Sequence, residues 1–260
     1  MTSLPTPPPG RALLAGKVVL VTAAAGTGIG NATARRCLEE GATVVLSDAH
    51  ERRLGEAAEE LTTLAGGTRP DTFVCDVTVE AQVQAMVDGA VASHGRLDVV
   101  VNNAGLGGTA ELVDMTDDQW SKVLDITLTG TMRCMRATLR HMYEAGGGVI
   151  VNNASVLGWR AQAGQAHYAA AKAGVMALTR CAAIEAAPHG VRINAVAPSL
   201  AMHAFLAKVT SDDLLDELTQ REAFGRAAEP WEIATVIAFL ASDYSTYMTG
   251  EVVSVSSQRA

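Results

Sequence analysis

The sequence contains few of the residues that mark several common classes of protein. Its 4 cysteines in 260 residues lie far apart without a CxxC pair, which argues against a disulfide framework and against a zinc site. Basic residues number 20 against 28 acidic ones and form no basic stripe, so we expect no nucleic-acid partner. No apolar run reaches the roughly 18 residues that span a bilayer, so we expect no membrane partner. A cytoplasmic protein without a bound metal fits this composition best.

The chain begins with a proline-rich segment and continues as one long stretch without repeats. Residues 1–10, MTSLPTPPPG, carry four prolines and lack the basic start and apolar run of a signal peptide. We therefore predict a mobile tail over residues 1–15 and a single folded domain over residues 16–260, which is long enough to bury a substantial core. The least regular interior stretch, residues 199–226, is predicted to be a lid over a ligand.

Seven short apolar runs alternate with alanine-rich stretches that are typical of helices, such as residues 32–40 and 82–93. The runs are apolar at nearly every position, which is typical of strands that helices cover on both faces. Right-handed crossovers between such strands predict a single-domain α/β fold of the Rossmann type, doubly wound around a seven-stranded parallel sheet. The runs begin at Lys17, Ala42, Asp71, Leu97, Gly148, Val191 and Glu251.

A glycine-rich turn, AAAGTGIG, follows the first apolar run and precedes a helix. Gly26, Gly28 and Gly30 in this turn let the backbone approach a pyrophosphate at the start of that helix. Asp48 ends the second run, where a carboxylate can accept hydrogen bonds from the ribose hydroxyls of an adenosine. The alternative is that Asp48 only caps the helix that follows it. The turn and the carboxylate together predict a dinucleotide site.

Polar residues also end the third and fourth runs. Asp76 follows the third run, and residues 102–105, Asn-Asn-Ala-Gly, follow the fourth. Because open α/β sheets bind ligands at the carboxyl ends of their strands, these residues are predicted to line the same site. Either segment, taken alone, could instead be a plain turn.

Tyr168 and Lys172 lie four residues apart in a stretch of good helix formers, so both side chains project from one helical face. A tyrosine is a poor acid or base at neutral pH, but a nearby ammonium favours the phenolate and lowers its pKa. Ser155, at the end of the fifth run, can place its hydroxyl on a reacting oxygen. The three residues predict proton transfer to or from a substrate oxygen.

With these motifs the sequence resembles the short-chain dehydrogenase/reductase family from Lys17 to Ser256. The stretch GQAHYAAAKAGV is nearest in pattern to the 3-oxoacyl reductase-like branch. The resemblance rests on the glycine turn, Asp76-Val77, Asn102-Asn103-Ala104-Gly105, Ser155 thirteen residues before Tyr168, the Tyr168-to-Lys172 spacing and RINAVAP ending at Pro198.

The resemblance implies an NAD(P)-dependent enzyme that interconverts a secondary alcohol and a ketone and assembles as a homotetramer. It implies that Ser155 orients the substrate oxygen, Tyr168 transfers the proton, and Lys172 binds the nicotinamide ribose and lowers the tyrosine pKa. The substrate expected is a small molecule, either a β-hydroxyacyl thioester or an alicyclic, steroid-like alcohol. Asp48 favours NAD over NADP. The residues expected to bind cofactor are Gly26, Gly28, Ile29, Gly30, Asp48, Asp76, Val77, Asn103, Ala104, Gly105, Tyr168, Lys172 and Pro198.

Four departures from the family pattern stand out. Ala23 follows Thr22 where the family has glycine, and the loop to Gly28 is one residue longer. Thr127 takes the place of a catalytic asparagine, and we expect its hydroxyl to hold a water in the proton relay. The other two departures are Ser199 with His203 after Pro198, and VSVSSQ in place of VDGG near the carboxyl terminus.

These departures leave a second function open, a catalytically silent dinucleotide-binding sensor or scaffold. The intact Ser155, Tyr168 and Lys172 favour an enzyme. The sequence has no GxSxG motif, which argues against a hydrolase.

Overall fold

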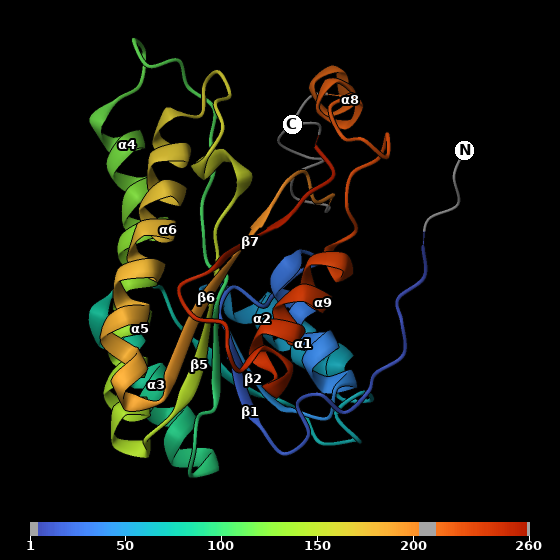
Figure 1. The fold of residues 1–260 in the computed structure, drawn as a ribbon, viewed down its shortest axis with the longest axis vertical. Helices are drawn as coiled ribbons and strands as arrows, with labels where there is room; N and C mark the ends of the chain where they lie inside the picture. The colour runs from blue at the N-terminus through green and yellow to red at the C-terminus, as the bar shows by residue number, and fades with distance from the viewer. Residues whose placement is uncertain (1–4, 203–211, 259–260) are drawn as a thin grey trace.

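The computed structural model describes residues 5–202 and 212–258, and within them the chain forms a seven-stranded parallel sheet between two layers of helices (Figure 1). The strand order is β3-β2-β1-β4-β5-β6-β7. The predicted Rossmann-type, doubly wound fold is therefore confirmed. The strands are β1 (Val18–Val21), β2 (Thr43–Asp48), β3 (Asp71–Val74), β4 (Val99–Asn102), β5 (Gly148–Asn153), β6 (Val191–Pro198) and β7 (Val252–Val255).

Helices cover both faces of the sheet, with α1, α2 and α9 on one face and α3, α5 and α6 on the other (Figure 1). The two predicted helices are present, although α1 and α3 begin two to three residues earlier than the apolar pattern indicates. The bounds are α1 (Ile29–Glu39), α2 (Glu51–Leu61), α3 (Glu80–His94), α4 (Asp117–Leu124), α5 (Gly130–Ala145), α6 (Ala166–Ala186), α8 (Asp212–Gln220) and α9 (Pro230–Ala241). A π-helical segment, Asp125–Thr129, joins α4 to α5.

The apolar strands supply a hydrophobic core on each face of the sheet because successive side chains point to opposite faces. In β1, Val19 and Val21 pack with α1 and α9, whereas Val18 and Leu20 pack with α3 and α5. All four are buried. This explains why the strands are apolar at every position rather than at alternate ones.

The amino-terminal segment is held against the body of the protein from Pro8 onward. The fully buried Glu40 accepts hydrogen bonds from the backbone N–H groups of Arg11 (2.7 Å) and Leu13 (3.0 Å). Arg36, which pairs with the same carboxylate, donates to the carbonyl oxygen of Pro8 at 2.6 Å. Residues 8–14 therefore belong to the folded domain, and the tail is shorter than the predicted residues 1–15. Composition could not reveal this, because the contacts join residues 27–29 positions apart.

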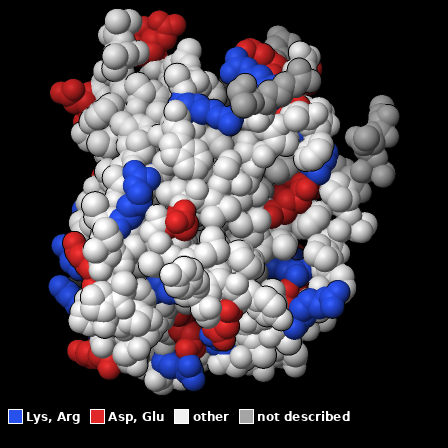
Figure 2. Space-filling model, in the orientation of Figure 1, with Lys and Arg blue, Asp and Glu red and all other residues white. Residues whose placement is uncertain are grey.

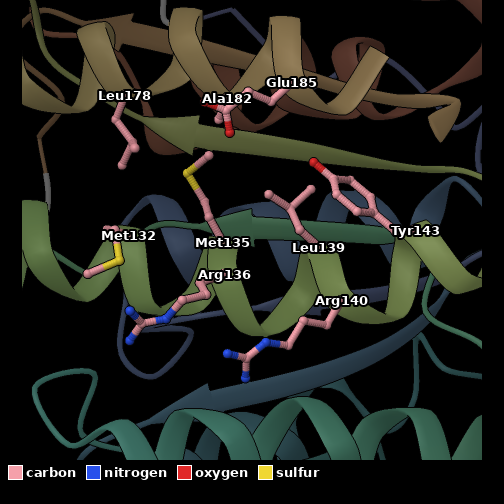
Figure 3. Close-up of a pocket in the computed structure, with 9 residues that line it drawn as sticks. All are labelled: Met132, Met135, Arg136, Leu139, Arg140, Tyr143, Leu178, Ala182 and Glu185. Atoms are coloured by element: carbon pink, nitrogen blue, oxygen red, sulfur yellow. The ribbon is translucent and has the colours of Figure 1, made fainter. Parts of the chain in front are cut away.

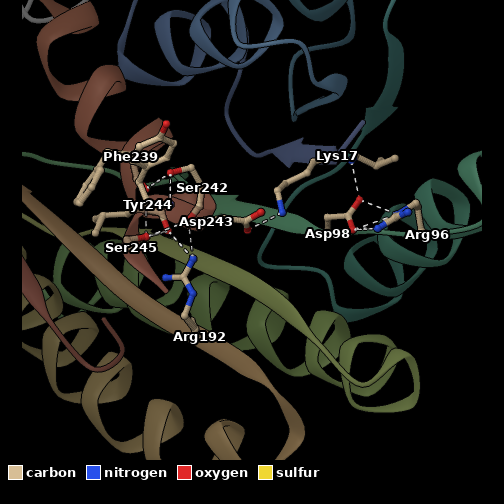
Figure 4. Close-up of polar contacts among 11 residues, drawn as sticks. Lys17, Arg96, Asp98, Arg192, Phe239, Ser242, Asp243, Tyr244 and Ser245 are labelled. Atoms are coloured by element: carbon tan, nitrogen blue, oxygen red, sulfur yellow. Dashed lines mark hydrogen bonds and ion pairs between the residues drawn. The ribbon is translucent and has the colours of Figure 1, made fainter. Parts of the chain in front are cut away.

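Charged residues near the amino ends of the strands are used to satisfy backbone groups (Figure 4). Arg192 in β6 donates to three carbonyl oxygens in the segment from α9 to β7, at 3.0–3.2 Å. Asp98 accepts from the N–H of Val18 at 2.8 Å, and Lys17 pairs with Asp243 at 2.9 Å. Because these charged groups have structural partners, we expect the active site at the opposite edge, where the carboxyl ends of the strands lie.

The surface mixes charges of both signs. On the face that Figure 2 shows, basic and acidic residues are interspersed among uncharged ones without a continuous basic stripe. Among the described residues, no helix has the length and apolar character needed to cross a membrane. Nor do these residues include a group of three or more histidine, cysteine or acidic side chains that could hold a metal ion.

Candidate active site

The carboxyl ends of β1 and β4 are tied together beside the glycine-rich turn. The hydroxyl of Thr22 accepts hydrogen bonds from the N–H groups of Asn103 (2.9 Å) and Ala104 (3.1 Å). The amide nitrogen of Asn103 donates in turn to the carbonyl oxygens of Thr22 (3.2 Å) and Ala23 (3.1 Å). This is the point where the strand order reverses, between β1 and β4, at which sheets of this kind bind ligands.

The start of α1 fits a pyrophosphate. Gly28 caps this helix without a side-chain hydrogen bond, and its first turn has no acidic residue, so its backbone N–H groups are available to an anion. A Cβ on Gly30 would lie 2.2 Å from the carbonyl oxygen of Ala23, so only glycine permits this close approach. Gly26 has a φ of +86° and nothing within 4 Å of where its Cβ would be. Ile29, the first helical residue, follows in the same turn.

Asp48 ends β2 next to this turn and is buried. Its two carboxylate oxygens accept hydrogen bonds from the N–H groups of Ala25 (3.2 Å) and His50 (2.9 Å). Burial raises the pKa of Asp48, while the Ala25 bond and the charge of Arg53 lower it. The N-cap of α2 is His50, so Asp48 does not cap the first turn of α2 and the alternative raised for it is wrong. Each oxygen keeps a lone pair for a ribose hydroxyl.

Ala23 lies in the left-handed region, with a φ of +50°. Among the described residues, Ala12 is the only other non-glycine residue with a positive φ. A Cβ is strained in this region because it crowds the following carbonyl oxygen. The family glycine that Ala23 replaces would avoid this strain.

We expect Ala23→Gly to raise the free energy of unfolding by about 1 kcal/mol, because the strain is relieved without loss of a contact. Urea unfolding measures this change. Ala25→Gly is the matched control, since Ala25 has no positive φ and a glycine there only loosens the unfolded chain. The expectation is wrong if both variants lose stability equally.

The other residues expected to bind cofactor lie at strand ends. The carboxylate of Asp76 accepts hydrogen bonds from the N–H (2.9 Å) and the hydroxyl (2.8 Å) of Thr78, so it also shapes a turn. Val77 is buried against Gly130, and Pro198 is the last residue of β6. His203 lies outside the described residues, as does part of the predicted lid, residues 203–211.

Ser155, Tyr168 and Lys172 come together where β5 meets α6. The hydroxyl of Ser155 lies close enough to Tyr168 to lower the pKa of its phenol. The buried Lys172 donates from Nζ to the carbonyl oxygen of Asn153 at 2.5 Å, and this Nζ lies 5.5 Å from the centroid of the Tyr168 ring. Asn153 also donates to the side-chain oxygen of Asn103 at 2.9 Å, which joins these residues to the glycine-rich turn.

Burial is the largest influence on the ionisation of this group. It raises the pKa of Tyr168, which the nearby Ser155 hydroxyl partly counters, and it lowers the pKa of Lys172 to about 8. The Ser155 hydroxyl lowers the pKa of Tyr168, and the lowering expected from Lys172, whose Nζ lies 5.5 Å from the ring centroid, stays a prediction. A tyrosine that keeps its proton at neutral pH suits a proton donor.

Thr127 lies in the π-helical segment and is fully buried. Its hydroxyl donates to the carbonyl oxygen of Leu106 at 3.2 Å and accepts from the N–H of the same residue at 3.0 Å. Its only proton is therefore engaged with the backbone, and one lone pair is left that can accept from a water. The structure favours a positioning role, in which Thr127 holds the loop after β4 beside Lys172.

We expect Thr127→Val to lower kcat about threefold to tenfold, because it removes two hydrogen bonds while keeping the side-chain shape. Thr127→Ser keeps the hydroxyl and is the control, for which we expect activity close to wild type. Steady-state kinetics at saturating cofactor measures the difference. A valine variant with unchanged kcat contradicts this role.

Two residues of this region were not expected from the sequence. Gln165 donates to the carbonyl oxygen of Gly108 at 2.8 Å, and His167 is buried next to Gly108 with its Nδ1 unpartnered among the described residues. A Cβ on Gly107 would touch the Tyr168 ring at 3.9 Å. The sequence signal for these close contacts is that three of the four residues after Asn103-Ala104 are glycines, namely Gly105, Gly107 and Gly108.

The chain belongs to the short-chain dehydrogenase/reductase family. Residues 23–257 match a family model of this group that is described as enoyl-(acyl carrier protein) reductase. The chain is thus an NAD(P)-dependent oxidoreductase that interconverts a secondary alcohol and a ketone.

Particular relatives are also close. The chain is 68% identical over 250 residues to the (5R,7aS)-5-hydroxy-7a-methyl-1-oxo-2,3,5,6,7,7a-hexahydro-1H-indene-carboxyl-CoA reductase of Mycobacterium tuberculosis, which covers 96% of this chain and 95% of the relative. It is 42% identical to the cis-4-hydroxycyclohexanecarboxylate dehydrogenase of Sinomonas cyclohexanicum over 92% of this chain and 94% of the relative. A short chain dehydrogenase from Mycobacterium smegmatis has a similar crystal structure, with a TM-score of 0.88, 62% identity and 99% of each chain covered. A silent sensor or scaffold has no counterpart among these relatives.

Proposed function

We propose that this protein is an NAD-linked oxidoreductase for a ring alcohol and its ketone, with a substrate that carries a carboxyl group or its thioester. The observation that carries the chemistry is the Ser155, Tyr168 and Lys172 cluster beside the glycine-rich turn. The two relatives named above support the substrate class, because both are named for a ring that bears a hydroxyl and a carboxyl or carboxyl-CoA group. Four unpaired cysteines support a reducing, cytoplasmic setting.

Each residue then has a task in the reduction of a ring ketone. The Ser155 hydroxyl holds the substrate oxygen, Tyr168 donates the proton to it, and Lys172 holds the ribose beside Gly105. The nicotinamide, when bound, supplies or accepts the hydride. Asp48 holds the adenosine ribose, and the start of α1 holds the pyrophosphate.

The experiment that tests the proposal follows absorbance at 340 nm with NAD or NADP. Its three substrates are 4-hydroxycyclohexanecarboxylate, the CoA thioester of that acid, and the acyclic 3-hydroxybutyryl-CoA. We expect turnover of a ring substrate with NAD. Turnover of the acyclic thioester alone would support the proposed oxidoreductase reaction but would show that a ring alcohol is not the substrate class.

We also propose that the protein is a homotetramer. A largely apolar groove runs between α5 and α6, with Met135, Leu139 and Tyr143 on one side and Leu178, Ala182 and Glu185 on the other (Figure 3). Arg136 and Arg140 point away from this groove toward α3, where Arg136 pairs with Glu80 at 2.7 Å. Such a groove is suited to the same two helices of a second copy, since symmetric contacts are the usual way in which soluble enzymes assemble.

Light scattering at micromolar concentration should then report about four times the chain mass of 27.0 kDa. We expect Leu139→Glu to lower this mass, because a charge in the groove is not compatible with a dry contact. Leu64→Glu is the control, since Leu64 is an exposed leucine that follows α2 on the other face. A monomeric wild type would overturn the tetramer.

A further inference from the structure

The turn that follows Ser155 carries two large side chains, Trp159 and Arg160, four and five residues after the serine. Ser155 caps a short 3-10 helix, Val156–Gly158, by accepting from the N–H of Leu157 at 3.2 Å. Trp159 and Arg160 come next, and the N–H of Arg160 bonds the carbonyl oxygen of Val156 at 2.9 Å. Half of Trp159 is exposed. Arg160 is thus held by the same turn that positions the Ser155 hydroxyl.

The guanidinium of Arg160 has a neutral partner. It donates to the side-chain oxygen of Gln258, and no carboxylate pairs with it within the described ranges. The two arginines between α8 and α9 have carboxylate partners instead: Arg226 pairs with Glu232 at 2.6 Å, and Arg221 pairs with Glu217. The positive charge of Arg160 is therefore oriented but not neutralised, and the guanidinium keeps further N–H donors.

The segment that carries Gln258 is held in place by a backbone bridge and by a buried carboxylate next to it. Glu222, almost fully buried, accepts from the hydroxyl of Ser257 at 2.8 Å and from the N–H of Leu200 at 3.4 Å. The N–H of Ala223 donates to the carbonyl oxygen of Ser257 at 2.5 Å, and Glu222 and Gln258 pair in an antiparallel bridge. The unusual carboxyl-terminal sequence VSVSSQ thus links residues 200 and 222, on either side of α8, to the Ser155 turn.

We propose that Arg160, positioned by Gln258, binds an anionic group of the substrate. A planar guanidinium with free donors recognises carboxylate and phosphate oxygens by paired hydrogen bonds, and a neutral amide partner orients it without cancelling its charge. Arg160 lies five residues from the hydroxyl that holds the reacting oxygen. A ring alcohol that carries a carboxylate offers carboxylate oxygens to this guanidinium, and a ring alcohol that carries a CoA thioester offers the phosphate oxygens of CoA. The inference rests on the proposed function, which it deepens.

The test compares anionic substrates with neutral partners that share the reacting carbon. One pair is 4-hydroxycyclohexanecarboxylate and its methyl ester, which tests the carboxylate as the anion. The other is the CoA thioester of that acid and its N-acetylcysteamine thioester, which tests the CoA phosphates. We expect Arg160→Gln to lower kcat/KM about tenfold for the anionic member of at least one pair and less than twofold for both neutral members. An equal loss on all four substrates would overturn the inference.

Three further variants separate charge recognition from a structural effect. Gln258→Glu keeps Arg160 but gives it a carboxylate partner, so we expect the same selective loss. Arg160→Lys keeps the charge, and we expect part of the selectivity to return. Arg221→Gln removes a charge that is already paired, so it should act on anionic and neutral substrates alike. A selective loss in Arg221→Gln as large as that in Arg160→Gln would assign the effect to general electrostatics and overturn the site.

A binding measurement keeps this inference separate from the proposed function. Calorimetry with the NADH-loaded protein measures the affinity for 4-hydroxycyclohexanecarboxylate and for CoA without turnover, because NADH and an alcohol cannot react with each other. Weaker binding of either anion by Arg160→Gln supports the site even if the proposed substrate class fails. Equal affinities for both anions in wild type and Arg160→Gln overturn it, even if ring alcohols are turned over.

Discussion

Tyr168→Phe is expected to lower kcat by about 100-fold or more while the affinity for cofactor stays within a few-fold. The substitution removes only the hydroxyl that donates the proton. The ring remains, and so does the contact of Lys172 with the carbonyl oxygen of Asn153, which does not involve the tyrosine. Steady-state kinetics gives kcat, and quenching of protein fluorescence by the cofactor gives its dissociation constant.

The pH profile distinguishes loss of a proton donor from loss of structure. Burial raises the pKa of Tyr168, so in the wild type the tyrosine is protonated at neutral pH and loses its proton only under alkaline conditions. Ketone reduction needs that proton, so its kcat should be level near pH 7 and fall as the pH rises. The residual activity of Tyr168→Phe should lack the fall at strongly alkaline pH, whereas a change near pH 8, where Lys172 loses its charge, should remain in both proteins.

Tyr244→Phe is the matched control, since it removes a phenol hydroxyl from an exposed position outside the site. We expect it to leave kcat unchanged. Near wild-type turnover in Tyr168→Phe would show that another group donates the proton, and the role given to this residue would be wrong.

The sheet could be predicted because its strands are apolar at nearly every position. Val18 and Val19 are both buried although they face opposite layers, and only a strand covered on both sides has that pattern. The pairing of Tyr168 with Lys172 could also be predicted from the sequence, since a spacing of four residues in a helix places both on one face.

The contacts of those residues could not be predicted, because they join distant segments. Lys172 bonds Asn153, and Thr127 bonds Leu106, across 19 and 21 residues respectively. Arg160 meets Gln258 across 98 residues. No local pattern specifies which backbone group a buried donor will find.

Asp48 is expected to make the wild type prefer NAD over NADP by more than tenfold in kcat/KM. The carboxylate can accept from the ribose hydroxyls of NAD, whereas the 2′-phosphate of NADP would lie against it. Two like charges about 4 Å apart repel by about 4 kcal/mol at an effective dielectric near 20, and this is an upper bound for a site that admits water. Half of that repulsion still corresponds to more than tenfold.

Two basic residues near Asp48 oppose this preference. Arg52 and Arg53 lie in the first turn of α2, and an arginine here can pair with the 2′-phosphate. Arg52 is bonded to Glu56 at 2.6 Å, so Arg53, whose charge already acts on Asp48, is the stronger candidate. Arg53 is exposed, where water and salt weaken its attraction, whereas Asp48 is buried. The buried charge is expected to dominate.

The measurement is kcat/KM for both cofactors with one active substrate in wild type, Asp48→Asn and Asp48→Ala. Asp48→Asn removes the charge but keeps an acceptor for the ribose, so we expect it to improve NADP while largely retaining NAD. Asp48→Ala removes the acceptor as well and should also weaken NAD. Arg53→Ala should lower only the residual activity with NADP. A wild type that prefers NADP would show that Arg53 outweighs Asp48, and it would overturn both the role given to the carboxylate and the proposed use of NAD.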